Sequence, residues 1–249
     1  MNTELEYSSN VTLTSSLISQ RIRYFMRGNY HGVSANWLAK QVEGIFQSVD
    51  GLVLNCGEFS NLDKSLIAEG ERVYLEVLQE NSGMNLGKNY DCEIGLASFL
   101  YSFIISTSPE VVIETGIANG ITTNVIMRAL EQTGGSLHSF DIDSRTSNVY
   151  SGFGKWEFHL LKENYERDLA EQVLQIHQPS RWVHVSNHGF KWQAFEYSLA
   201  HKTLDLGGVL VSDDIDSSTA WGIIGNQLFD SSFAVFDKRK FFGIATFRN

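Results

Sequence analysis

A loop with two glycines, residues 114–120 (ETGIANG), directly follows the apolar run Val111–Ile113 and precedes a segment with helical spacing. Gly116 would let the chain turn sharply away from a strand, and Gly120 would let backbone approach a ligand closely. The spacing is neither the GxGxxG of a dinucleotide fingerprint nor the GxxxxGK[ST] of a phosphate loop. Glu114 suits a cationic or amine-bearing ligand. The pattern fits either a cofactor loop or an ordinary strand-to-helix loop.

Two carboxylates, Asp141 and Asp143, end the next apolar run (LHSFDID). They come one helix and one strand after the loop. A carboxylate at this point can accept hydrogen bonds from both hydroxyls of a ribose. A solvated loop acid is the alternative for either residue. The two features in this order favour an adenosine-type cofactor.

A second acidic pair, Asp213 and Asp214, follows the apolar run Val209–Ser212. Paired carboxylates suit Mg²⁺ or a similar hard cation, which could hold a substrate hydroxyl and lower its pKa. His188 could remove the proton of that hydroxyl, since neutral imidazole is a competent base near pH 7. Helix capping by the Asp pair and a purely structural histidine remain the alternatives.

These residues require elements that bring them to one edge of a sheet. Apolar runs predict strands at 111–113, 137–142, 156–161, 182–186 and 209–212, and helical spacing predicts helices at 93–107, 122–132, 164–176 and 191–204. Two β-rich runs, 233–236 and 241–247, flank the polar turn DKRK and predict an antiparallel hairpin. This alternation predicts an α/β fold with a doubly wound, mostly parallel sheet, in which ligands bind beyond the carboxyl ends of the strands.

The first ninety residues show a different pattern. Apolar residues recur at helical spacing over 15–27, 36–46 and 65–78. We expect residues 1–90 to form a helical N-terminal extension that serves as a lid or an oligomer contact. Residues 91–249 would form the ligand-binding domain.

Composition excludes several classes of protein. The 249 residues carry a net charge of −10, which disfavours nucleic acid as a partner. Two cysteines without CxxC spacing favour a reducing cytoplasm. The longest apolar stretch, residues 94–105, is shorter than the ~20 residues of a membrane-spanning helix, and the acidic N-terminus does not have the pattern of a signal peptide.

Three stretches together resemble a known family: VVIETGIANGITTNVIMRAL…GGSLHSFDID, the segment HVSNHGF at 184–190, and FEYSLAHKTLDLGGVLVSDDID. They are similar to class I S-adenosylmethionine-dependent methyltransferases, more narrowly to the macrocin O-methyltransferase and cephalosporin hydroxylase-like group. The resemblance runs from about residue 93 to the C-terminus and implies a Rossmann-like methyltransferase fold. It implies S-adenosylmethionine as the cofactor, with the ribose on Asp141, or on Asp143 as second choice. The methionine part would lie at the loop, on Glu114, Thr115, Gly116, Gly120 and Thr122.

The chain departs from this family at one position. The resemblance implies a metal-ligating Asp directly after His184, and this chain has Val185 there. The expected metal set is reduced to Asp213 and Asp214, which leaves three hypotheses: a metal-independent enzyme with His188 as base, weak Mg²⁺ binding, or a site that has lost its activity.

The leading hypothesis is an O-methyltransferase, with His188 and Asp214 as catalytic residues, acting on a hydroxyl of a small molecule such as a sugar or secondary metabolite. It would be a cytoplasmic biosynthetic enzyme, with no nucleic-acid or membrane partner, and a homo-oligomer. A non-catalytic S-adenosylmethionine-binding protein and a hydroxylase-like family member are the alternatives.

Overall fold

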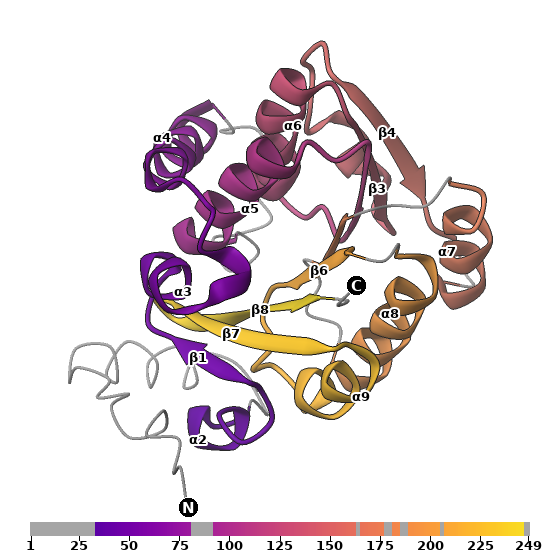
Figure 1. Ribbon diagram of the computed structural model, residues 1–249. Helices are drawn as coiled ribbons and strands as arrows, with labels where there is room; N and C mark the ends of the chain where they lie inside the picture. The colour runs from indigo at the N-terminus through magenta and orange to yellow at the C-terminus, as the bar shows by residue number, and fades with distance from the viewer. Residues whose placement is uncertain are drawn as a thin grey trace, which may run out of the picture.

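The computed structural model describes residues 33–80, 92–162, 165–176, 181–184, 189–204 and 207–246. Within these residues the chain builds one eight-stranded sheet with helices on both faces (Figure 1). The strands are β1 (Gly44–Phe46), β2 (Val111–Thr115), β3 (Ser136–Asp141), β4 (Lys155–Leu160), β5 (Arg181–His184), β6 (Val209–Ser212), β7 (Ser231–Asp237) and β8 (Lys240–Thr246). The α-helices are α2 (Ala35–Leu38), α3 (Val49–Asn55), α4 (Lys64–Glu80), α5 (Ile94–Thr107), α6 (Ile121–Thr133), α7 (Tyr165–Val173), α8 (Phe190–Thr203) and α9 (Asn226–Leu228).

The strand order is β1-β7-β8-β6-β5-β2-β3-β4. Among the described strands, only β8 runs against its neighbours: it pairs antiparallel with β6 and with β7, and the other pairings are parallel. From β2 the chain adds β3 and β4 on one side and later β5 and β6 on the other. The order therefore reverses between β2 and β5, which is where open α/β sheets bind ligands. The doubly wound sheet and the C-terminal hairpin predicted from the sequence are confirmed.

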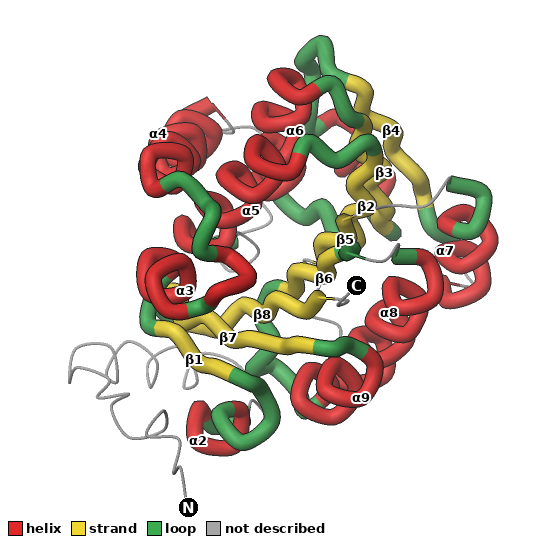
Figure 2. The backbone as a smooth tube through the Cα atoms, in the orientation of Figure 1, coloured by secondary structure: helices red, strands yellow, loops and turns green. Residues whose placement is uncertain are grey.

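Adjacent residues in each strand face opposite layers of helix. Val112 of β2 packs in the cluster formed with α3, α4, α5 and α6, whereas Ile113 packs in the cluster formed with α7 and α8. Figure 2 shows these two helical layers on either side of the sheet. Buried parallel strands read as continuous apolar runs because both of their faces are covered.

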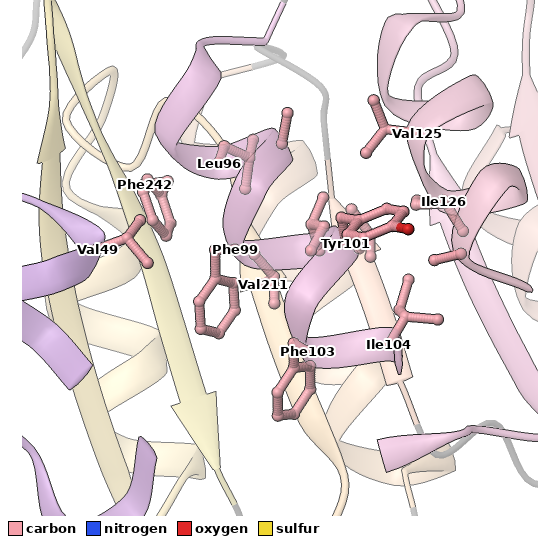
Figure 3. Packing of buried hydrophobic residues seen from close by; sticks show 14 of the residues in the cluster. Val49, Leu96, Phe99, Tyr101, Phe103, Ile104, Val125, Ile126, Val211 and Phe242 are labelled. Carbon is pink, nitrogen blue, oxygen red and sulfur yellow. The ribbon is translucent and has the colours of Figure 1, made fainter. Parts of the chain in front are cut away.

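Helix α5 is apolar nearly all round because it lies between the sheet and the outer helices. Phe99 stacks on Phe103 one turn further along, with ring centroids 5.3 Å apart, and also contacts Phe242 of β8. Figure 3 shows this helix packed between Val211 and Phe242 of the sheet and the residues of α6. Among the described residues, no helix is long and apolar enough to cross a membrane.

The helix predicted over 36–46 is wrong for most of its length. Helix α2 ends at Leu38, and Gly44–Phe46 is the edge strand β1, which pairs in parallel with Phe233–Val235 of β7. The N–H of Glu43 also donates to the carbonyl of Ser232, at 2.8 Å. A helix over these residues, which Gly44 disfavours, would leave the backbone groups along the edge of β7 without partners. Pairing of β1 with β7 satisfies those groups instead.

The N-terminal part is therefore not wholly helical in the residues described. The helix expected over 65–78 is confirmed as α4, and residues of α3 and α4 share one apolar cluster with α5 and α6. The helix expected over 15–27 lies outside the described residues. The division into two domains at residue 90 stays a prediction.

Candidate active site

The loop after β2 adopts a conformation that requires its glycines. Gly116 has φ +82° and Gly120 has φ +77°, and Ala118 between them also has a positive φ, of +50°. The N–H of Gly120 donates to the carbonyl of Ile117, at 2.8 Å, which closes the turn immediately before α6 begins. A non-glycine residue at positive φ is uncommon and concentrates at functional sites.

Gly120 also allows the loop to pack closely on the segment after β3. A Cβ at this position would lie 2.4 Å from the Cβ of Val149. Gly134, at the other end of α6, has φ +88° but would place a Cβ in open space.

We therefore expect Gly134→Ala to lower the free energy of unfolding by about 1–2 kcal/mol from backbone strain alone. Gly120→Ala should cost about 1–3 kcal/mol more, because the added methyl group overpacks against Val149. Urea unfolding of the two variants measures the difference. Equal losses would show that the contact with Val149 does not contribute to the cost of the added methyl group.

Asp141 joins the end of β3 to this loop. Its Oδ2 accepts hydrogen bonds from the backbone N–H groups of Ile117, at 2.8 Å, and Ala118, at 3.3 Å. Its Oδ1 accepts from the N–H of Asp143, at 2.8 Å. An ionised carboxylate has about four acceptor positions, so Asp141 can still accept from a ligand. The structure thus brings the predicted ribose acid onto the predicted cofactor loop.

Asp143 does not share this placement. Its carboxylate accepts from the backbone and side chain of Arg145, which lowers its pKa to about 2. It caps the short 3-10 turn Ser144–Asn148. Between the two acids that the sequence offered for a ribose, the geometry favours Asp141.

Glu114 lies fully buried beneath the loop. Its Oε2 accepts from the hydroxyls of Thr123 on α6, at 2.8 Å, and Ser139 on β3, at 2.6 Å. Its Oε1 is buried and has no hydrogen-bond partner among the described residues. Burial raises the pKa of this carboxyl to about 7, an effect that the two hydroxyl groups oppose. Glu114 therefore ties β2, β3 and α6 together, and Oε1 is the atom left for another group.

Thr115 and Thr122, also predicted to bind the cofactor, are both buried. The Thr115 hydroxyl donates to Oε2 of Glu196 on α8, at 2.7 Å, and the Tyr165 hydroxyl of α7 donates to the other oxygen of the same carboxylate. The Thr122 side chain instead forms a hydrogen bond with the Cys92 thiol. Sequence reasoning missed the roles of Glu196 and Tyr165. Glu196 lies in the stretch FEYSLAHKTLDLGGVLVSDDID, but no role was predicted for it, and Tyr165 lies in a helix outside the three stretches.

The second acidic pair is ion-paired to a lysine of the same chain. Nζ of Lys240, the first residue of β8, lies 2.6 Å from Oδ2 of Asp213 and 3.3 Å from Oδ1 of Asp214. All three side chains are buried. Burial raises the pKa of Asp213, although the ammonium group opposes this effect. Lys240 belonged to a polar turn in the sequence, so nothing there indicated this role.

The backbone at the acidic pair is strained. Asp214 has φ +49°, and its N–H donates to Oδ1 of Asp213, at 2.9 Å. Ile215 N–H donates to the carbonyl of Phe241, at 3.0 Å, which fixes the loop after β6 to the start of β8. The hairpin therefore places Lys240 against both carboxylates.

Cys92 links the acidic pair to the loop after β2. Its thiol forms a hydrogen bond with Thr122 in the first turn of α6 and lies within electrostatic range of Asp213 and Lys240. Burial raises the pKa of this thiol above its ordinary value. The predicted cofactor loop and the Asp213–Asp214 pair therefore belong to one region at the carboxyl ends of the strands.

This arrangement does not fit Mg²⁺. A divalent cation needs several oxygen ligands around it, and the ammonium group of Lys240 already contacts both carboxylates. In sequence, Val185 stands where the family resemblance implied a further carboxylate ligand. Val185 and the predicted base His188 both lie outside the described residues, as does the side chain of His184.

A family model described as a methyltransferase domain matches residues 113–215, from within β2 to just past the Asp213–Asp214 pair. The match covers less than half of the chain. The matched residues contain most of the glycine loop, Asp141 and the acidic pair, and Lys240 lies in the hairpin beyond the match. A search of curated proteins finds no match.

Solved structures share the architecture at low sequence identity. An O-methyltransferase from Bacillus cereus in complex with SAH is 15% identical, with a TM-score of 0.54 over 84% of this chain and 98% of that one. A putative O-methyltransferase from Klebsiella pneumoniae is 14% identical, with a TM-score of 0.55 over 75% and 96% of the two chains. TomG from Streptomyces achromogenes, an O-methyltransferase involved in tomaymycin synthesis and solved with SAM, is 12% identical, with a TM-score of 0.51 over 75% and 91%.

Proposed function

We propose that this protein is an S-adenosylmethionine-dependent O-methyltransferase that acts on a hydroxyl group of a small molecule, such as a sugar or a secondary metabolite. One observation carries the proposal: the Asp141 carboxylate is hydrogen-bonded to the glycine loop at the point where the strand order reverses. The match of a methyltransferase domain to residues 113–215 supports it. We also propose that the enzyme serves biosynthesis and is cytoplasmic. The two free, buried cysteines support the cytoplasmic location. The enzyme's assembly as a homo-oligomer stays a prediction.

The residues present fit S-adenosylmethionine. Asp141 retains acceptor capacity for ribose hydroxyls, and the turn from Gly116 to Gly120 exposes backbone beside it. The buried, unpartnered Oε1 of Glu114 is the acceptor that suits the amino group of the methionine part. When bound, S-adenosylmethionine supplies an electrophilic methyl group for transfer to oxygen.

The residues of the chain orient the acceptor and manage its proton. Asp213, Asp214 and Lys240 form a fixed set of charges at the carboxyl end of β6, where an acceptor hydroxyl would be oriented. Transfer to oxygen releases the hydroxyl proton, which His188 would accept as base. We propose that this site works without a resident metal ion, because Lys240 supplies the positive charge.

Asp141→Ala should weaken S-adenosylmethionine binding at least about 10-fold, since hydrogen bonds to a charged group contribute about 1.5–3 kcal/mol. Asp143→Ala is the matched control and should change the Kd less than about 3-fold, because Asp143 is bonded to Arg145 instead of the loop. Titration calorimetry with the full chain measures both. No binding to the unaltered protein at millimolar concentration would overturn the cofactor assignment.

Activity requires a separate measurement. Transfer of labelled methyl groups to a panel of sugars, phenols and polyketide alcohols should reveal an acceptor, with a rate unchanged by EDTA or Mg²⁺. Binding of S-adenosylmethionine without transfer to any of them would favour the non-catalytic alternative.

A further inference from the structure

A second group of metal-ligating side chains lies on β3 and β4, away from the methyltransferase site. His138 of β3 is the register partner of Glu157 on β4, and Phe140 is the partner of His159. Phe140 packs in the cluster formed with α7 and α8, and alternation along the strands places His138, Glu157 and His159 on that same face. His138 precedes Asp141 by three residues, which is about 10 Å along a strand.

The ligand atoms of these residues are close together. Nδ1 of His138 lies 3.1 Å from Nε2 of His159 and 3.5 Å from Oε2 of Glu157. One ligand atom from each residue can be chosen so that all lie within 4.8 Å of one another. Two ligands about 2.0–2.1 Å from a tetrahedral Zn²⁺ are separated by roughly 3.3 Å. The two short distances therefore match a zinc site without rearrangement of the strands.

The surrounding residues hold the imidazoles in place. The His159 ring stacks on Phe140, with centroids 4.4 Å apart and planes at 13°, and forms a side-chain hydrogen bond with Gln172 of α7. The His138 side chain is 13% exposed, whereas that of Glu157 is 63% exposed, so an ion can enter from the solvent side. Two imidazoles and one carboxylate with an open fourth position are a donor set that suits Zn²⁺.

We propose that His138, Glu157 and His159 bind a Zn²⁺ ion, with water as the fourth ligand. The ion joins the edge strand β4 to β3, the strand that carries Asp141. This proposal is independent of the methyltransferase function, because in the described part of the chain no hydrogen bond or ion pair joins its ligands to the loop or to the Asp213–Asp214 pair. The competing explanation is a simple hydrogen bond between the two imidazoles, beside a solvated glutamate.

The test is zinc binding by the full chain after chelator treatment, measured in competition with a chromophoric chelator. We expect one Zn²⁺ per chain, at least 100-fold weaker binding in His159→Gln, and about 10-fold weaker binding in Glu157→Gln. His201→Gln on α8 is the matched control and should leave zinc affinity unchanged. Co²⁺ should give the intense visible absorption of a tetrahedral site, and His159→Gln should abolish it.

The outcomes separate the two explanations. Zinc affinity that survives both His159→Gln and Glu157→Gln would overturn the proposal and would assign any bound zinc to other histidines of the chain. Absence of zinc binding to the unaltered chain would also overturn it. If His159→Gln fails to fold, Glu157→Gln decides alone, because the exposed Glu157 side chain can be changed without disturbing the core. S-adenosylmethionine binding by each variant reports separately on the methyltransferase site.

Discussion

Lys240→Met should lower the free energy of unfolding by about 3–5 kcal/mol, because it leaves Asp213 and Asp214 buried together without their cation. For a chain of this size, such a loss corresponds to a decrease in Tm on the order of 10 °C. Methionine keeps most of the volume of the lysine chain, so the loss reports on charge more than on packing. Urea and thermal unfolding measure the effect.

Lys238→Met is the matched control for this experiment. It makes the same substitution in the same turn, but Lys238 is exposed, and we expect a change below about 0.5 kcal/mol. If Lys240→Met fails to fold, the double variant Lys240→Met/Asp213→Asn removes one of the two acids and should recover part of the stability. Equal stability of Lys240→Met and the unaltered protein would contradict a stabilising role for the two ion pairs.

The same variant tests the absence of a resident metal. With Lys240 removed, the two carboxylates become available to a hard cation, so Mg²⁺ or Ca²⁺ should raise the Tm of Lys240→Met. Neither ion should raise the Tm of the unaltered protein. Stabilisation of the unaltered protein by Mg²⁺ would show that the ion displaces or bypasses Lys240.

The second large effect is a pH dependence of stability that originates from Glu114. Its pKa is about 7 in the folded protein, against an ordinary value of 4.5. Between these two pH values the folded state keeps a proton that the unfolded chain has released. The stabilising contribution is therefore fully present below about pH 4.5 and is lost as the pH rises through 7. At about 1.4 kcal/mol per pKa unit, the loss amounts to about 3 kcal/mol.

Glu114→Gln isolates this contribution. Glutamine resembles the protonated acid: its carbonyl oxygen can accept from Thr123 and Ser139, and its amide replaces the protonated oxygen. When the pH is raised from 5 to 8, the unaltered protein should lose about 3 kcal/mol of stability relative to the variant. Urea unfolding at both pH values measures it.

Glu110→Gln is the control, since Glu110 is exposed just before β2 and its replacement should leave the pH dependence unchanged. Burial also raises the pKa of Asp237 to about 6, but both proteins share this residue, so its effect cancels. Parallel pH curves for Glu114→Gln and the unaltered protein would contradict the raised pKa.

The order of elements and the place of the glycine loop followed from local patterns in the sequence. Period-two and helical spacing are local properties, so the strands from β2 to β8 and helices α4 to α8 were predictable. Gly116 and Gly120 were predictable because a left-handed backbone selects glycine locally. The parallel sheet then implied that Glu114, Asp141 and Asp213 would meet at the carboxyl ends of the strands.

Tertiary structure decided the rest. Strand β1 forms because it pairs with the edge of β7, which lies nearly 190 residues further along the sequence. Only the folded chain shows that Asp141, and not Asp143, is bonded to the loop. Lys240 reaches the acidic pair through the turn of a hairpin, and Glu196 reaches Thr115 from helix α8. Each of these contacts joins segments that are distant in sequence. The desolvation of a carboxylate and its pairing with a cation or hydroxyl depend on where those segments meet, and no local pattern encodes that.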